Sequence, residues 1–260
     1  MNILFTLCGR AGSKGVRGKN ARDFLNVPLV WYSMAGIALY IEKYKKAEDN
    51  IDIVVNTDSE DLIRLVEEVK ELKIIPLRRD ASLAGDRVPK TAVILDSLNR
   101  SSIYFSRKYD MVVDLDITSP LRTVVDIKKA IDKKTSRSEV NVVYSVVPSR
   151  RNPYFNMVKE KDGYFVDAFP SNFTTRQEAP SFFDMNASIY AYDAKALQEK
   201  DLKTFFNEKC DAILMQDTGV LDIDSEEDYE LMQVIASYLF NREGGYKEIH
   251  RKVLEWNFPR

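Results

Sequence analysis

Short apolar runs alternate with longer amphipathic stretches over the first 147 residues of the chain. The short runs predict strands, and the stretches with apolar residues at helical spacing predict helices. This alternation is typical of βα units that pack as a mostly parallel sheet between helices, so we expect an α/β fold. The predicted strands are 3–7, 51–56, 73–76, 111–115 and 141–147, and the predicted helices are 28–44, 60–72, 90–98 and 124–133.

The pattern changes after Val147, where eight of the chain's 28 aromatic residues fall between Tyr154 and Phe183. Apolar stretches at 154–158 and 164–168 flank Asp162-Gly163, a pair that favours a tight turn, and so predict a β-hairpin. An aromatic hairpin outside an α/β core is a covering flap, a subunit interface or additional core packing. Helices are predicted at 226–239 and, in the tail, at 246–256.

The composition excludes several classes of protein. With 260 residues and 45% hydrophobic side chains, the chain can bury a sizeable core. Its net charge of -2 lacks the overall positive charge that is typical of nucleic-acid-binding proteins. Cys8 and Cys210 lie too far apart in sequence to indicate a disulfide framework or a metal site. The first apolar run is too short for a membrane span or a signal peptide, so we expect a cytoplasmic protein without membrane association.

The single histidine limits the possible chemistry. Ser-His, Cys-His and His-metal mechanisms all need a histidine in the active site. His250 lies in a charged tail, where we expect a surface position. These mechanisms are therefore not expected here.

The glycine-rich segment after the first predicted strand carries the highest local positive charge. Between Arg10 and Arg22 there are five basic residues and no acidic one. The interspersed glycines let backbone N–H groups approach oxygen atoms closely, and the basic side chains can neutralise phosphate. The spacing fits neither a P-loop nor Gly-x-Gly-x-x-Gly. We interpret the segment as a different phosphate site; a solvated basic loop is the alternative.

Two aspartates in the C-terminal part of the chain form a candidate metal site. If Asp222-Ile223-Asp224 is a strand, its alternation places both aspartates on one face, where they can bind one hard cation. The alternative is that Asp224 or Ser225 caps the helix that follows. Both roles are compatible.

Several motifs resemble the acylneuraminate cytidylyltransferase (CMP-sialic acid synthetase) family. In the basic loop, six residues match the family pattern Ala-Arg-x-x-Ser-Lys-Gly followed by Lys-Asn, namely Arg10, Ser13, Lys14, Gly15, Lys19 and Asn20. The segment 115–122 matches six of the eight residues of Leu-Gln-Pro-Thr-Ser-Pro-Leu-Arg, and its Thr118, Ser119 and Arg122 can give hydroxyls and a guanidinium to a bound polar ligand. The departure that matters is Asp116 in place of glutamine, which changes either the sugar recognised or the metal shell. In the aromatic region, 150–156, 172–177 and 184–190 resemble the branch that activates legionaminic acid.

The resemblance implies a three-layer α/β/α Rossmann-like nucleotidyltransferase fold with a mostly parallel mixed sheet and a protruding β-hairpin dimerisation arm. It implies a nucleotide-binding catalytic domain formed by 1–147 and 184–240, an arm at 148–183 that contributes to dimerisation and sugar binding, and a helical tail at 241–260. It also implies a homodimer in which arm residues reach the partner's active site.

The implied reaction transfers CMP from CTP to the anomeric 2-hydroxyl of a nine-carbon α-keto acid sugar, with N,N'-diacetyllegionaminic acid as the first choice, and releases pyrophosphate. Mg²⁺ is the implied cofactor, with Asp222 and Asp224 as its ligands. The expected catalytic residues are Arg10, Lys14 and Asp222. The expected nucleotide-binding residues are Gly9, Arg10, Gly12, Ser13, Lys14, Lys19, Asn20, Arg79, Asp86 and Lys90, and the expected sugar-binding residues are Asp116, Thr118, Ser119, Arg176, Gln177 and Asn186.

Three other functions stay open from the sequence. N-acetylneuraminic acid is the alternative sugar within the family. A hexose-1-phosphate nucleotidyltransferase would share the general architecture and a basic loop, but its nucleophile would be a sugar phosphate. A non-catalytic nucleotide-binding module is the third, although the basic loop and the aspartate pair are both intact.

Overall fold

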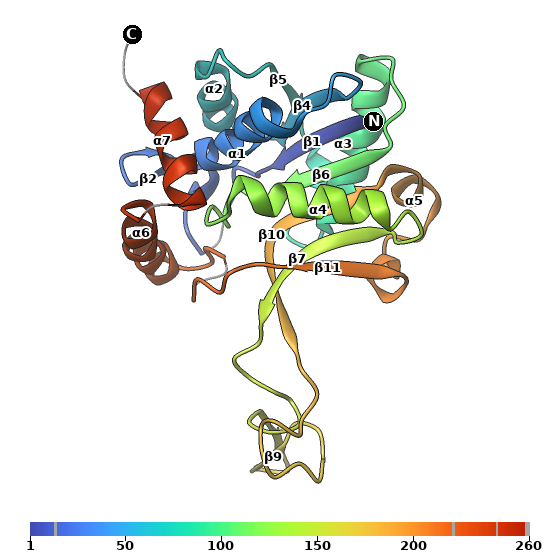
Figure 1. Ribbon diagram of the computed structural model, residues 1–260, viewed down its shortest axis with the longest axis vertical. Coiled ribbons are helices and arrows are strands. Elements are labelled where there is room, and N and C mark those ends of the chain that lie inside the picture. Colours follow the sequence, from blue (N-terminus) through green and yellow to red (C-terminus); the bar gives the residue numbers. More distant parts are fainter. Residues whose placement is uncertain (13–14, 220–221, 243, 258–260) are drawn as a thin grey trace.

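The computed structural model describes residues 1–12, 15–219, 222–242 and 244–257, and a seven-stranded mixed sheet lies at its centre (Figure 1). The strand order is β11-β7-β10-β6-β1-β4-β5. Neighbouring strands are parallel except around β10, which is antiparallel to both β6 and β7. The strands are β1 Asn2–Cys8, β4 Asn50–Thr57, β5 Ile74–Arg78, β6 Met111–Leu115, β7 Val142–Pro148, β10 Phe183–Asp193 and β11 Cys210–Leu214.

Helices cover both faces of the sheet and form two separate buried clusters, because successive strand residues point to opposite faces. In β1, Ile3 and Phe5 join the larger cluster and Leu4 joins the smaller one. The larger cluster contains side chains of α1 Leu29–Tyr44, α2 Glu60–Glu68, α4 Val124–Ser136, α6 Glu226–Phe240 and α7 Gly245–Asn257. The smaller contains side chains of α3 Lys90–Tyr104 and α5 Ala194–Glu199. No helix in the described part of the chain is long and apolar enough to cross a membrane.

The predicted three-layer α/β/α fold with a mixed sheet is therefore confirmed. Each strand and helix expected in the first 147 residues is present, with shifted ends such as α2 stopping at Glu68 and α3 continuing to Tyr104. The sequence did not predict β10, β11 or α5. In β10 the register shifts between Met185 and Tyr190, and Ala187 has a φ of 55°, so this strand lacks a regular apolar alternation.

The segment between β7 and β10 extends away from the sheet and carries a small hairpin (Figure 1). Its strands are β8 Val158–Lys161 and β9 Tyr164–Asp167, and the Asp162-Gly163 turn has positive φ angles of 53° and 82°, as a tight hairpin turn requires. The prediction that residues 154–157 form a strand is wrong. The side-chain oxygen of Asn152 accepts from the Tyr154 N–H, and these residues form a turn instead.

A second small hairpin lies directly after the glycine-rich segment. It pairs β2 Asp23–Phe24 with β3 Val27–Pro28, and Leu25 and Asn26 between them have positive φ angles. Short 3₁₀ turns are present at Lys19–Ala21, Ala81–Leu83 and Phe205–Asn207. The hairpin of β2 and β3 thus leads the chain into α1.

His250 is not the surface residue that the sequence led us to expect. Its ring stacks on Phe240 at 4.6 Å between centroids and on Tyr32 at 6.0 Å. Its Nδ1 lies 3.1 Å from the Tyr32 hydroxyl oxygen. Burial of the ring lowers the pKa of His250 below its usual value of 6.5. The amphipathic spacing of α7 buries this side, although the surrounding sequence is highly charged.

The lowered pKa of His250 predicts a loss of stability in mild acid. The unfolded chain takes up a proton near pH 6.5 that the folded chain resists, so the free energy of unfolding falls as the pH drops through that value toward the folded pKa. Thermal unfolding between about pH 7.5 and about pH 5.5 measures this effect. In a His250→Phe variant, which keeps an aromatic ring in the stack, we expect a smaller fall in Tm. An equal fall in the Tm of both proteins would contradict the assignment of this pH effect to His250.

Candidate active site

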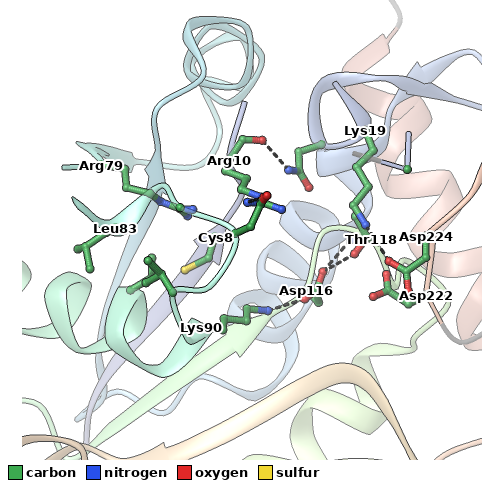
Figure 2. A pocket seen from close by; sticks show the side chains of 16 residues that line it. Cys8, Arg10, Lys19, Arg79, Leu83, Lys90, Asp116, Thr118, Asp222 and Asp224 are labelled. Carbon is green, nitrogen blue, oxygen red and sulfur yellow. Dashed lines mark hydrogen bonds and ion pairs between the residues drawn. The ribbon is translucent and has the colours of Figure 1, made fainter. Parts of the chain in front are cut away.

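A polar cavity of about 420 Å³ opens beyond the carboxyl ends of β1, β5 and β6. This is the edge at which open α/β sheets bind ligands. Figure 2 places Arg79, Leu83 and Lys90 on one side of it and Asp222 and Asp224 on the other, with Asp116 and Thr118 between them. Its lining consists of Cys8, Arg10, Gly15, Lys19, Asn20, Arg79, Leu83, Gly85, Asp86, Val88, Lys90, Val93, Asp116, Thr118, Asp222 and Asp224.

The glycine-rich segment forms one wall of the cavity, and neighbouring elements fix its backbone. The Gly9 N–H donates to Asn56 O at 3.3 Å, and the Asn20 side chain donates to Arg10 O at 3.0 Å. A Cβ added to Gly9 would lie 2.8 Å from Leu62 Cδ2, so the backbone of this segment packs closely against the Leu62 side chain. The Arg10 guanidinium donates to the Asp86 carboxylate across the mouth of the cavity.

Gly15 makes an even closer approach at the other end of the segment. A Cβ at this position would lie 1.8 Å from the backbone oxygen of Asp224. Lys19 reinforces this contact, since its Nζ donates to Ile223 O at 2.5 Å and lies 3.4 Å from Asp224 Oδ1. The glycine-rich segment and the aspartate pair, about two hundred residues apart, therefore form one structural unit.

Arg79 is held in a fixed orientation at the opposite side. Its Nε donates to Asn56 Oδ1 at 2.9 Å and its Nη2 donates to Asn56 O at 2.7 Å. Asn56 is fully buried and in turn donates to Asp96 at 2.9 Å and to Ser97 at 3.0 Å. This chain of hydrogen bonds between β4, β5 and α3 aims a preoriented cation into the cavity.

The floor of the cavity is an ion-pair cluster. Lys90 Nζ lies 2.7 Å from Asp114 Oδ2 and 2.5 Å from Asp116 Oδ2. Burial alone would lower the pKa of Lys90, but the two carboxylates raise it well above its ordinary value. For Asp116, burial alone would raise the pKa, while Lys90 and the Thr118 N–H and hydroxyl lower it to about 2. Asp116 is therefore an anion that can only accept hydrogen bonds.

Two carboxylates occupy the end of the cavity opposite Arg79. Asp222 is partly buried, and this burial, together with the facing charge of Asp116, raises its pKa. Asp224 has an 80% exposed side chain. The predicted strand is absent, because the Ile223 N–H donates to Thr118 O and Asp222 Oδ1 instead of a ladder partner. Both aspartates nevertheless line the same cavity, as expected.

Helix α6, which follows the aspartate pair, is capped by Ser225. Metal binding, considered for Asp222 and Asp224, and capping of the helix are therefore roles of different residues. Ser225 and Asp228 form a capping box at the start of α6. Asp224 is thus free of the capping role. Among the described residues no group of three or more His, Cys, Asp or Glu side chains has the arrangement of a complete metal site. Any cation here would take its remaining ligands from a substrate or water.

The structure brings together most, but not all, of the residues expected in the site. Arg10, Lys19, Asn20, Arg79, Asp86, Lys90, Asp116, Thr118, Asp222 and Asp224 all line the cavity. Gly9 is buried behind it, Gly12 is exposed in the same segment, and Ser13 and Lys14 lie outside the described residues. The remaining four expected residues are Ser119, Arg176, Gln177 and Asn186, and they do not line it.

These four residues occupy two other places. Ser119 and Asn186 are buried where the 116–122 segment meets β10, and the Ser145 hydroxyl donates to Asn186 Oδ1 at 2.5 Å. Gln177 is exposed in the segment between β9 and β10. Arg176 is in the same segment and donates to Ser149 O at 3.1 Å. Both residues line a small cavity of about 170 Å³.

Arg122 has a different role from the one its motif indicated. We expected its guanidinium to be available to a bound ligand, but the side chain is fully buried. It donates to Ser188 Oγ at 2.8 Å, to Ser33 Oγ at 2.9 Å and to Ser119 O at 2.5 Å, and it also donates to Asp116 O. Arg122 therefore supports the segment that carries Asp116 and Thr118, and its guanidinium is buried among protein groups.

From the sequence we expected Asp114 at the strand end beside the site but assigned it no role, and we did not expect Cys8 in the site. Asp114 is fully buried at the end of β6, where the Thr6 hydroxyl donates to it at 2.7 Å. An acidic residue inside the apolar run Met-Val-Val-Asp-Leu was the available signal. Burial and the nearby Asp114 raise the pKa of the Cys8 thiol, so it stays neutral. A cysteine beside a glycine-rich segment gave no signal by itself.

Comparison with known proteins shows which family the chain is similar to. The family model described as cytidylyltransferase matches residues 7–243. The chain is 36% identical over 233 residues to "Post-translational flagellin modification protein B" of Campylobacter coli, covering 90% of this chain and 94% of that one. It is 37% identical over 235 residues to the CMP-N,N'-diacetyllegionaminic acid synthase of Campylobacter jejuni, covering 90% and 95%.

A solved structure supports the same assignment at the level of the fold. A CMP:2-keto-3-deoxy-manno-octonic acid synthetase complexed with CTP superposes with a TM-score of 0.64 at 15% identity, covering 92% of this chain and all of that one. At this identity the likeness concerns the architecture alone. The family match over residues 7–243 and the two relatives identify the chain as a nucleotidyltransferase that belongs to the cytidylyltransferase family.

Proposed function

We propose that the protein transfers CMP from CTP to the anomeric 2-hydroxyl of a nonulosonic acid, with N,N'-diacetyllegionaminic acid as the substrate, and releases pyrophosphate. The observation that carries the proposal is the cavity with cationic side chains at one end and a carboxylate pair at the other. Support for the sugar comes from the relative named for that product and from the segments at 150–156, 172–177 and 184–190.

The basic wall would receive the nucleotide. Arg79 is already fixed by Asn56 and needs no further ordering to meet the base or ribose. Arg10 is paired with Asp86, but their side chains are 31% and 41% exposed, so phosphate oxygens can compete for the guanidinium. An Arg–phosphate pair is charge-assisted and often bidentate. Lys19 lies between this wall and the aspartates, and Lys14 is proposed to assist from the same segment.

The carboxylate pair fits a divalent cation. Two carboxylates lining one polar cavity are hard oxygen donors. Burial and the facing charge of Asp116 raise the pKa of Asp222, and the charge of a cation would favour its ionised form. We assign Asp222 and Asp224 as the residues that would hold Mg²⁺. When bound, Mg²⁺ would neutralise phosphate charge and acidify the sugar hydroxyl. Asp222 is the better-fixed ligand, because Thr118 anchors the following residue.

The chemical step needs little from the side chains beyond positioning and charge. The 2-hydroxyl oxygen forms a bond to the α-phosphorus, the bond from that phosphorus to pyrophosphate breaks, and the hydroxyl proton is released. Asp116, an acceptor held by Lys90 and Thr118, can orient a hydroxyl or amide N–H of the sugar. Orientation and preorganised charge account for much of the catalysis in such transfers.

The arm supports the proposal of a homodimer. In β8 and β9 every residue is exposed, including Tyr164 at 74% and Phe165 at 75%. An isolated two-stranded hairpin is only marginally stable in water, so such an apolar surface favours a covering partner. A second copy of the chain would cover it and would bring Arg176 and Gln177 to the partner's cavity. Their distance from the cavity of their own chain then has a simple explanation.

A substrate panel tests the proposed reaction. Pyrophosphate release is measured with CTP and Mg²⁺ for N,N'-diacetyllegionaminic acid, N-acetylneuraminic acid, pseudaminic acid, Kdo and a hexose 1-phosphate. We expect a preference of about tenfold or more in kcat/KM for the first sugar, equivalent to roughly 1.4 kcal/mol in the transition state. Preference for another nonulosonic acid would refute the choice of sugar. Binding of CTP without turnover of any sugar would refute the enzyme proposal.

Replacing Asp222 by Asn tests the metal assignment. The amide keeps the shape of the side chain but loses the charge, so kcat should fall by about 10² or more. Circular dichroism and Tm should stay close to those of the native protein. Glu227→Gln makes the same change at an exposed position of the same segment and should leave kcat unchanged. Native-like activity of Asp222→Asn would remove this residue from the metal site.

The dimer proposal is tested on the arm. Phe165→Glu places a charge on the exposed apolar hairpin and should convert the dimer to a monomer in light scattering coupled to gel filtration. Turnover should fall with it, because the arm would no longer reach a partner. Ile103→Glu is the matched control, since Ile103 is 80% exposed but lies on α3. A monomeric native protein with full activity would contradict the proposal.

A further inference from the structure

Helix α7 lies beyond the region that the family model matches, which ends at residue 243. It runs beside α1 and α6 in Figure 1 and contacts α1, α4 and α6. Its buried residues are Ile249, Lys252 and Val253.

Three contacts join α7 to the structure behind the cavity. A Cβ added to Gly245 would lie 2.8 Å from both Cβ and Cγ2 of Thr123, so the start of α7 rests directly on that residue. One turn further on, Ile249 packs at Gly36 of α1, where Ile127 and Leu115 also meet. His250 then stacks on Tyr32 of α1.

Two of these contacts are one residue away from groups that hold the cavity floor. Thr123 directly follows the buried Arg122, whose guanidinium donates to the carbonyl oxygens of Asp116 and Ser119. Tyr32 directly precedes Ser33, whose hydroxyl donates to Asp116 O at 3.1 Å and accepts from Arg122 Nη1 at 2.9 Å. The contacts of α7 therefore converge on the backbone between Asp116 and Thr123.

Polar contacts at the far end keep α7 in place. Lys252 is almost fully buried, and its Nζ lies 2.6 Å from Glu42 Oε1 and 2.5 Å from Glu71 Oε1. The Trp256 Nε1 donates to Glu71 Oε2 at 2.7 Å, and its ring meets that of Trp31 edge-on at 6.3 Å. A partly buried ion pair with these additional hydrogen bonds fixes one geometry.

We propose that α7 is a positioning element for the cavity floor, with Gly245 and His250 as the positioning residues that fix the 116–123 segment through Thr123 and α1. Asp116 and Thr118 project from that segment, and Asp222 depends on it through the Ile223–Thr118 hydrogen bond. Arg79, in contrast, is held by β4 and α3. The effect on catalysis, which rests on the proposed function, should therefore concern the sugar and the chemical step more than CTP binding.

The chain contains a reporter for the docking of α7. Its only two tryptophans are Trp31 on α1 and Trp256 on α7, and they touch each other. Tryptophan fluorescence therefore measures whether α7 remains in contact with α1. Hydrogen exchange of the 116–123 amides measures the order of the segment itself, without any substrate. These two measurements separate local release from general unfolding.

The experiment compares Gly245→Ala and His250→Ala with Arg251→Ala, an exposed position on the same helix. In the two test variants we expect faster hydrogen exchange at 116–123 with protection of β1 unchanged. We expect kcat/KM for the sugar to fall roughly ten- to a hundredfold, the scale of a misplacement of about 1 Å, with the Kd of CTP within about twofold. The Arg251→Ala protein should behave as native.

The possible results separate failure of the proposed function from failure of the positioning role of α7. If the native protein turns over no sugar, the proposed function fails, while hydrogen exchange still tests the positioning role. Native-like exchange and turnover in both test variants would overturn the inference. Equal losses of sugar turnover, CTP affinity and protection of β1 would also overturn it, since they indicate a general loss of stability. Because Gly245→Ala adds only one methyl group, at least one variant is expected to fold.

Discussion

The buried guanidinium of Arg122 is the interaction on which the site depends. Its hydrogen bonds join α1, the 116–119 segment and β10 around one charge that has no exposed surface. Isolation from water lowers the pKa of Arg122 to about 10, so it remains protonated at neutral pH. A buried charge is costly unless hydrogen bonds surround it, and here hydroxyls and carbonyl oxygens provide them. The backbone that supplies those oxygens is thereby held in one conformation.

The charge layout of the cavity follows from this support. Asp116 can face Lys90 because Arg122 and Ser33 hold the carbonyl oxygen of Asp116 from behind. The same segment accepts the Ile223 N–H and so places Asp222 opposite the basic wall. Gly15 closes the arrangement, because only a glycine permits the approach of Asp224 O. Arg79 and the pair Asp222 and Asp224 thus lie on opposite sides of a single polar cavity (Figure 2).

The sequence predicted much of this site because its signals were local. Glycine spacing with basic residues indicated the anion wall, and Asp-Ile-Asp indicated two converging carboxylates although the expected strand did not form. Local signals failed where packing decides. Arg122 looked like a ligand contact and is buried, while His250 looked exposed and is stacked. Neither difference is visible in a window of neighbouring residues, since both depend on contacts with α1.

The sequence by itself determined the α/β class, the family and the kinds of side chain available, because hydrophobic period and motif spacing are properties of short segments. Only the tertiary structure decided that β10 enters the sheet between β6 and β7, since a strand with a register shift carries no regular pattern. It alone placed Arg176 and Gln177 away from the cavity and Lys90 between Asp114 and Asp116. These contacts join residues far apart in the chain, and their energies depend on burial and distance, which sequence order does not specify.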